Sequence, residues 1–454
     1  MSKMRTIKGK RHGAASVLTR PARMNLKLIN DPRQNGQTRR FTHWREVRQS
    51  RFLLPALIIA AMVQIIGDIT LAPKTFDSVE YLALSESLFH NRGYSASAGL
   101  NGFHHFIGES PTRMRQPGYP VFLVLTYWAL GRSTLVVRII QLVMLLGSLC
   151  LVESIAAISL RDSHWPISIL IVACYFPWLW TSCLILSESL FIFLLSMSVY
   201  FIARALFTPQ RLKSSLLAGM TLGLLALVRP IGLIVSCFSL IPFLVRYGLK
   251  GGVRSWSVCA AATVLVLTPW SIRNLRSFGE LTPISSESGY NLWASSLQKN
   301  EPVWFDNPQF QEATRGAYYI DRNASERFQR LAWRNFSKSP ISLMKQGIAR
   351  SVSAWFRFPG SGNFSDTMAA RVLALIQGAV VTCAIVGLWN VPRVALWLLL
   401  TPILAIIVMQ PLTPPVTRYL LPVAPYYLIL AGNGIRRLVR YFPLRGQRNR
   451  GKGV

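Results

Sequence analysis

The segment 75–89 begins with a carboxylate followed by an amphipathic pattern. Asp77 comes at its start, and apolar residues follow at helical spacing: Tyr81, Leu84, Leu88 and Phe89. This spacing predicts an amphipathic helix with Asp77 near its N-terminus. Two interpretations of Asp77 are open: it caps the helix, as Asp often does, or it accepts a proton from a substrate.

A second segment, 111–120, brings two arginines together. Arg113 and Arg115 lie just before the sequence Pro117-Gly118-Tyr119-Pro120. Guanidinium groups donate parallel hydrogen bonds and bind phosphate well in partly dry surroundings. Long basic side chains also extend from an apolar surface into water without binding a ligand. On charge alone, both interpretations of this pair are open.

Other polar and sulfur-containing residues carry weaker signals. Glu109 and the neighbouring His104-His105 offer ligands for a divalent ion, but adjacent histidines point in different directions on most backbones. We therefore predict no metal site and no cofactor. The six cysteines lie in apolar segments without CxxC spacing, which is typical of packed small side chains.

The composition indicates which elements must position these residues. Of the 454 residues, 51% are hydrophobic and only 15% are charged, and the mean hydropathy is +0.34. So little polar surface indicates a membrane protein. The net charge of +32 would suggest a nucleic-acid partner in a soluble protein. Here residues 1–51 and 436–454 carry much of it, and basic tails beside apolar spans mark the cytoplasmic side of a membrane. We predict no nucleic-acid partner.

Apolar runs long enough to cross a bilayer recur along the chain. Ten such runs lie at 52–72, 134–159, 165–183, 187–206, 213–229, 231–247, 254–271, 371–389, 393–410 and 419–435. The shorter run 120–130 is interpreted as juxtamembrane, because two cytoplasmic tails require an even number of crossings. The sequence thus predicts an all-α, polytopic membrane protein with about ten transmembrane helices.

This topology divides the chain into parts. Between the basic tails 1–51 and 436–454, residues 52–435 form the membrane module. Two polar stretches, 74–117 and 274–370, then lie on the outer face and carry juxtamembrane helices. Both termini are predicted to be cytoplasmic.

The second outer stretch is rich in aromatic residues, among them Tyr290 and Trp293. Aromatic side chains line many sugar sites, and they also gather at membrane interfaces, so both interpretations are open. Residues 325–357 are predicted to be helical. The face that we expect to dock on the spans includes Phe328, Leu331, Ala332, Phe336, Leu343, Ile348 and Val352.

Five short motifs follow one another along the chain. They are Asp77-x-x-x-Tyr81-x-x-Leu84, Arg115-x-Pro117-Gly118-Tyr119-Pro120, Ser187-Glu188-Ser189-Leu190-Phe191, Leu227-Val228-Arg229-Pro230 and Pro269-Trp270-Ser271-Ile272-Arg273-Asn274. This order resembles the bacterial GT-C glycosyltransferases. Within them it is similar to the branch that uses polyprenyl-phosphate-linked sugars, which includes protein O-mannosyltransferase relatives and lipid A aminoarabinose transferases. Arg418-Tyr419-Leu420-Leu421-Pro422 is similar to the C-terminal pattern of that family, so the resemblance covers residues 52–435.

The resemblance implies an integral glycosyltransferase in a bacterial inner membrane. Its donor would be a polyprenyl phosphate sugar, its acceptor a periplasmic lipid, glycan or protein, and the transfer would proceed with inversion. Asp77 would be the catalytic base, with Glu109 or, as the other candidate, Glu80 as a second acid, and Arg115 would contact the carrier phosphate. Several relatives have Lys-Pro-Pro where this chain has Arg115-Gln116-Pro117. Further candidates for substrate binding are Arg113, Tyr81, Arg273 and Arg418.

Two more charged residues fall at outer span ends. For Glu188, a functional and a structural pairing are both open, and bracing of the outer loops is favoured for Arg229. The alternative to an enzyme is a transporter or flippase of a lipid-linked saccharide, which also needs many spans and a phosphate-binding arginine. The corresponding repeats with broken helices that mark such transporters are not found in the sequence, which favours the enzyme.

Overall fold

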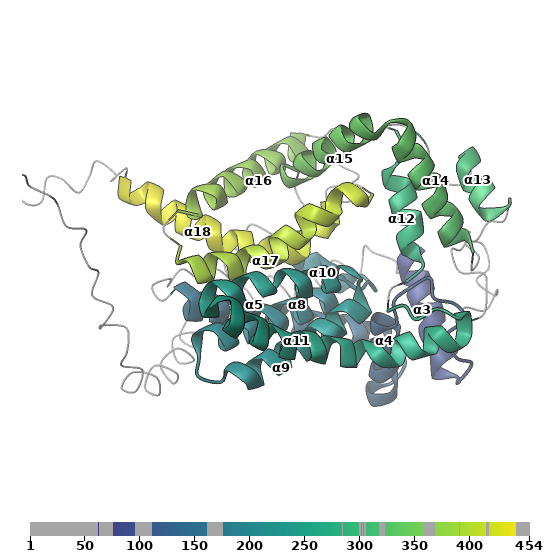
Figure 1. Ribbon diagram of the computed structural model, residues 1–454, viewed down its shortest axis with the longest axis horizontal. Helices are drawn as coiled ribbons and strands as arrows, with labels where there is room; N and C mark the ends of the chain where they lie inside the picture. The colour runs from purple at the N-terminus through teal and green to yellow at the C-terminus, as the bar shows by residue number, and fades with distance from the viewer. Residues whose placement is uncertain are drawn as a thin grey trace, which may run out of the picture. The chain divides into compact units, whose positions relative to one another are not determined.

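A computed structural model describes most of the unit Leu54–Val454. The described residues are Met62, 76–95, 111–160, 176–283, 285–298, 301, 303, 306–316, 323–357, 368–389, 391–414 and 417–441. Within these residues the regular secondary structure is helical throughout (Figure 1), which confirms the predicted all-α class.

The helices follow the predicted order of apolar and amphipathic segments. In chain order they are α3 (Phe76–Phe89), α4 (Gly118–Leu130), α5 (Thr134–Leu160), α7 (Phe176–Trp180), η2 (Thr181–Cys183), α8 (Glu188–Phe207), α9 (Arg211–Val228), α10 (Ile231–Phe238), α11 (Leu240–Phe278), α12 (Glu287–Ser295), α13 (Pro308–Thr314), α14 (Ala324–Lys338), α15 (Pro340–Trp355), α16 (Met368–Gly387), α17 (Arg393–Met409), η3 (Gln410–Leu412), η4 (Thr417–Val423) and α18 (Ala424–Tyr441).

The amphipathic helix predicted from the first outer segment is present as α3. Its apolar residues Tyr81 and Leu84 are buried, and Asp77 lies in its first turn, where the helix dipole favours negative charge. The helix is followed by Asn91 and Gly93, whose φ values of 58° and 79° turn the chain away.

Helix α4 packs beside α3 and against the end of α9. A Cβ atom on Gly118 would lie 2.7 Å from the carbonyl oxygen of Leu227, so only glycine permits this approach. The 13 residues of α4 span about 20 Å, which is less than the roughly 30 Å of a bilayer core. This length is consistent with the juxtamembrane interpretation of 120–130.

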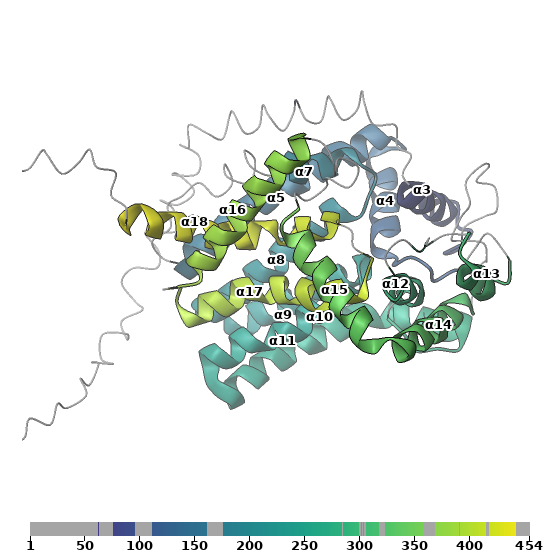
Figure 2. The ribbon, with the colours of Figure 1, turned by 90° about the horizontal axis from the view of Figure 1, so that it is seen from above.

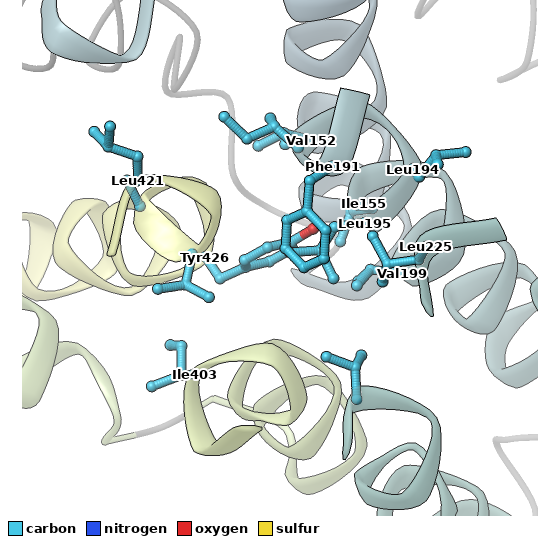
Figure 3. Packing of buried hydrophobic residues seen from close by; sticks show 14 of the residues in the cluster. Val152, Ile155, Phe191, Leu194, Leu195, Val199, Leu225, Ile403, Leu421 and Tyr426 are labelled. Atoms are coloured by element: carbon cyan, nitrogen blue, oxygen red, sulfur yellow. The ribbon is translucent and has the colours of Figure 1, made fainter. Parts of the chain in front are cut away.

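The apolar helices share one hydrophobic core. Figure 3 shows side chains from α5, α8, α9, α17, η4 and α18 that meet in it. The buried residues Ile155, Phe191, Leu225, Ile403 and Tyr426 represent five of these elements. This core holds the ends of the helices in fixed positions relative to one another.

Five helical stretches of the described residues are long and apolar enough to cross a membrane. They are Thr134–Leu160, Glu188–Phe207, Arg211–Val228, Ile231–Phe278 and Arg393–Leu412. The stretch Ile231–Phe278 unites the predicted spans 231–247 and 254–271. Gly248, with φ of 67°, interrupts its helical backbone. A Cβ on Gly252 would lie 2.8 Å from the Cα of Leu244, so the chain folds back on itself at this turn.

The remaining predicted spans fall on shorter or partly described segments. The run 371–389 coincides with α16, and 419–435 coincides with η4 followed by α18, which continues to Tyr441. The run 52–72 lies outside the described residues except for Met62. The run 165–183 is described from residue 176 onward, as α7 and η2.

The second outer stretch forms a small core of its own. Tyr290 and Trp293 of α12 contact Phe310 of α13 and Phe328 of α14, and all four are buried. Tyr290 and Trp293 are therefore packing residues and form no exposed platform. In both views α12, α13 and α14 lie at the same end of the molecule as α3 (Figures 1 and 2).

Residues 325–357 are largely helical as predicted, but they form two helices that meet at Ser339 and Pro340. Proline lacks a backbone N–H and disfavours helical geometry in the residue before it. Phe328, Leu331, Ala332 and Leu343 are buried as expected. Ile348 and Val352 are exposed instead, so the predicted docking face does not continue along α15.

Candidate active site

The site begins at Asp77, whose carboxylate lies between two guanidinium groups. Oδ1 accepts a hydrogen bond from Nη2 of Arg115 at 2.7 Å, and Oδ2 accepts one from Nη2 of Arg418 at 2.6 Å. These distances are typical of charge-assisted hydrogen bonds. Asp77 thus connects the first outer loop to η4, 341 residues further along the chain.

Arg115 is a hub for three carboxylates. Its Nη2 donates to Asp77, its Nε donates to Oε2 of Glu80 at 2.6 Å, and its Nη1 donates to Oε1 of Glu287 at 2.8 Å. Glu80 lies one turn after Asp77 on α3, whereas Glu287 is the first residue of α12. Each guanidinium nitrogen of Arg115 therefore has a carboxylate partner.

The other half of the site lies where α8 begins and α9 ends. Nη2 of Arg229 forms an ion pair with Oε1 of Glu188 at 2.7 Å, and Nε of Arg229 donates to Oγ of Ser187 at 2.9 Å. Nε of Arg418 is 3.6 Å from the same Oε1 of Glu188. Tyr81 of α3 donates its hydroxyl to Oγ of Ser187 at 3.3 Å, so α3 is attached to both halves.

These contacts form a continuous series of alternating charges, which we call the ion-pair network. In order of contact its members are Arg229, Glu188, Arg418, Asp77, Arg115 and Glu287, with Glu80 as a branch on Arg115. With every group ionised, four carboxylates face three guanidinium groups, and the network carries one excess negative charge.

Solvent reaches only part of the network. The side chains of Asp77, Glu287 and Arg418 are 21%, 27% and 32% exposed, whereas those of Arg115 and Glu80 are 7% and 2% exposed. The side chain of Arg229 is also 19% exposed. Two carboxylates and two guanidinium groups of the network are therefore open to direct contact with a substrate.

Burial and charge shift the acids of α3 in opposite directions. Burial opposes ionisation of Asp77, but the charges of Arg115 and Arg418 together act more strongly, and the pKa of Asp77 lies well below its usual value of 3.8. For Glu80, burial outweighs the attraction of Arg115 and raises the pKa to about 7. The network thus holds one firmly ionised carboxylate and one that titrates near neutral pH.

The structure brings together Asp77, Tyr81, Arg115 and Arg418 among the residues predicted from the sequence. The ring of Tyr81 lies 5.7 Å from the guanidinium carbon of Arg115. Glu109 and His104-His105 lie outside the described residues. Within the described residues, no group of three or more His, Cys, Asp or Glu side chains is arranged to hold a metal ion.

Two predicted arginines make contacts next to the network. Arg113 forms two hydrogen bonds with Glu280, at 2.6 and 3.1 Å. Arg273 donates to the backbone oxygen of Tyr94 at 3.2 Å, and the hydroxyl of Tyr94 donates to the backbone oxygen of Arg115 at 3.1 Å. Arg273 therefore supports the segment that carries Arg115.

Glu287 was not predicted from the sequence as a site residue. A signal existed, because Ser285-Ser286-Glu287 has the pattern of a helix N-terminus within the outer stretch. That pattern places an acidic residue at the start of a helix. It does not reveal that the residue faces Arg115, which lies 172 positions earlier.

Comparison with known protein families and with curated proteins finds no match to this sequence. Among solved structures, the fold is similar to that of ArnT from Cupriavidus metallidurans bound to undecaprenyl phosphate. The TM-score is 0.45 and the sequence identity 12%, over 86% of this chain and 78% of that chain. The apo structure of the same protein gives a TM-score of 0.39 with 13% identity, over 85% of this chain and 78% of that chain.

Proposed function

We propose that this chain is an integral membrane glycosyltransferase of a bacterial inner membrane. It transfers a sugar from a polyprenyl phosphate donor to an acceptor at the outer face, with inversion. The observation that supports this most is the partly exposed carboxylate of Asp77 between Arg115 and Arg418, at the end of a bundle of apolar helices. The motif resemblance points to the same chemistry.

In the proposed reaction Asp77 is the general base. As the acceptor oxygen forms a bond to the anomeric carbon, its hydroxyl proton passes to the Asp77 carboxylate. The bond between the anomeric carbon and the phosphate oxygen breaks, and its electron pair leaves with the phosphate. The products are a glycoside and free polyprenyl phosphate.

Arg418, and not Arg115, is the proposed ligand of the donor phosphate. Nε, Nη1 and Nη2 of Arg115 each donate to a carboxylate, and its side chain is buried. Arg418 is more exposed, and it lies in η4 directly before α18. Arg229 directly follows α9 and contacts the same Glu188 oxygen that lies 3.6 Å from Arg418. Guanidinium groups at a partly dry membrane face stabilise the negative charge of a departing phosphate.

Phosphate binding would also make Asp77 a stronger base. An incoming phosphate that contacts Arg418 competes with Asp77 for the same guanidinium and adds negative charge nearby. Both effects raise the pKa of Asp77 from its low resting position toward the range in which a carboxylate accepts protons effectively. Arg115 would remain attached to Asp77 and keep the carboxylate in place.

Cells with and without the gene provide the test. Mass spectrometry of lipid A, surface glycans and envelope proteins should show one hexose or pentose missing when the gene is deleted. The wild-type gene and a matched control, Glu312→Gln, should restore it, because Glu312 pairs with Arg334 at the exposed surface of the outer stretch. Asp77→Asn should not restore it. Unchanged glycans in the deletion strain would contradict the proposal.

A second measurement separates the enzyme from the transporter alternative. Purified protein in vesicles should release polyprenyl phosphate from a polyprenyl-phosphate-linked sugar when the acceptor is present. Movement of intact donor between leaflets, without release of polyprenyl phosphate, would support a flippase instead.

A further inference from the structure

The second outer stretch places the carboxylate of Glu287 near Asp77, the candidate base. Glu287 and Asp77 accept hydrogen bonds from Nη1 and Nη2 of the same guanidinium, that of Arg115. The two terminal nitrogens of one guanidinium are close neighbours, so the two carboxylates lie side by side. Both are partly exposed, whereas Glu80, the third partner of Arg115, is buried.

Glu287 is held in place by packing around the start of α12. The backbone N–H of Ser286 donates to the backbone oxygen of Arg113 at 3.0 Å, which attaches α12 to the segment that carries Arg115. Two residues after Glu287, a Cβ atom on Gly289 would lie 2.2 Å from the backbone oxygen of Ser325 in α14. The helix therefore presents Glu287 from a fixed position, as a binding residue requires.

Glu287 is the most exposed of the three carboxylates that contact Arg115, at 27% against 21% for Asp77 and 2% for Glu80. A carboxylate offers about four acceptor positions, and the exposed fraction of Glu287 leaves some of them open. The group that such a position suits is a hydrogen-bond donor in the substrate.

From its position, Glu287 is expected to contact the acceptor rather than the sugar donor. In an inverting transfer the attacking hydroxyl and the departing phosphate lie on opposite faces of the sugar. Oδ2 of Asp77 faces Arg418, the proposed phosphate ligand, and Oδ1 faces Arg115, which carries Glu287. Glu287 therefore lies on the side of Asp77 that is away from the phosphate.

We propose that Glu287 accepts a hydrogen bond from a hydroxyl group on the carbon next to the attacking hydroxyl of the acceptor. The acceptor is then a saccharide. A serine or threonine side chain has only one hydroxyl group, so it offers no second, adjacent hydroxyl that could donate to Glu287. This inference rests on the proposed function and names the acceptor class of that same site.

The test uses purified full-length protein in lipid nanodiscs, a panel of polyprenyl-phosphate-linked hexoses and pentoses, and methyl hexopyranosides as acceptor probes. A serine-containing peptide is the competing probe. Glu287→Gln keeps an oxygen that accepts from Arg115 but lowers acceptor strength. It should raise the KM for the methyl hexopyranoside about tenfold, with the KM for the donor and the melting temperature unchanged. Glu287→Asp should recover part of the affinity, and Glu312→Gln should match the wild type.

Deoxy analogues of the methyl hexopyranoside make the assignment specific. Removal of one particular hydroxyl should raise the KM of the wild type and should have little further effect in Glu287→Gln, because the two changes remove the same contact. Equal sensitivity of wild type and Glu287→Gln to every deoxy analogue would overturn the inference. So would faster transfer to the serine-containing peptide than to any methyl hexopyranoside. A wild-type protein that releases no polyprenyl phosphate with any donor and probe would instead overturn the proposed function.

Discussion

Replacement of Asp77 by Asn is the most direct test of the proposed base, because it removes the proton acceptor and keeps the size of the side chain. In the wild type, one carboxylate oxygen accepts from Arg115 at 2.7 Å and the other accepts from Arg418 at 2.6 Å. Asn has one oxygen and one NH2 group, so one guanidinium keeps its acceptor and the other faces a donor. The substitution thus removes one charge-assisted hydrogen bond together with the base.

These two losses differ in size and in what they affect. A hydrogen bond to a charged group contributes about 1.5–3 kcal/mol when buried. Because Asp77 is 21% exposed, we expect a stability loss of roughly 1–2 kcal/mol. A folding free energy on the order of 5–15 kcal/mol tolerates this loss, so the protein should accumulate. Loss of a positioned base lowers the rate by about 10²–10⁴, which corresponds to about 3–5 kcal/mol in the activation barrier.

The assay compares the kcat of sugar transfer with the protein level in the membrane. Glu80→Gln and Glu287→Gln are matched controls, because each also neutralises a carboxylate on Arg115 while Asp77 stays intact. Both should reduce kcat much less than Asp77→Asn, and so should Glu109→Gln. The comparison separates the loss of a base from a change in charge around Arg115.

Two results would refute this reasoning about Asp77. Transfer by Asp77→Asn at nearly the wild-type rate, with equal protein level, would leave Asp77 as a residue that only holds α3 to its neighbours. An equally large loss of kcat in Glu80→Gln would show that the charge balance around Arg115 matters, and not a proton acceptor at position 77.

Three further predictions follow from the ion-pair network and the topology. Arg418→Ala should raise the KM for the polyprenyl phosphate donor more than Arg115→Ala does. Arg115→Ala should mainly lower kcat, because Arg115 positions the base. Equal donor KM values for the two variants in steady-state kinetics would instead assign phosphate binding to Arg115. Since the pKa of Glu80 is raised from 4.5 to about 7, its neutral form stabilises the fold below pH 4.5 and that contribution is lost as the pH rises through 7. The melting temperature of the wild type should therefore fall relative to Glu80→Gln across this window, by an amount that corresponds to roughly a few kcal/mol, and a pH-independent difference would contradict the shift. Cysteine introduced at the exposed Asp306 should react with an impermeant thiol reagent in intact cells, whereas cysteine at the exposed Gln210 should not, and the opposite pattern would reverse the proposed orientation.

Local patterns were enough to predict the helical elements. A membrane span depends on about 20 consecutive apolar residues, and an amphipathic helix depends on spacing within a few turns, so α5, α8, α9 and α3 could be predicted with nearly correct bounds. The break between α14 and α15 was missed although Pro340 marks it. The apolar periodicity on both sides of Pro340 does not show this break, which follows from the missing backbone N–H of proline.

The sequence by itself determined that this is an all-α membrane protein, and it identified Asp77, Arg115 and Arg418 as chemically capable residues. Only the tertiary structure decided which charges meet. Arg115 was expected to face a phosphate and instead holds three carboxylates, one of them from Glu287, 172 residues away. Asp77 and Arg418 are 341 residues apart. Hydropathy and helical spacing are properties of neighbouring residues, whereas an ion pair requires that packing bring distant helix ends within about 3 Å, and no local pattern records that distance.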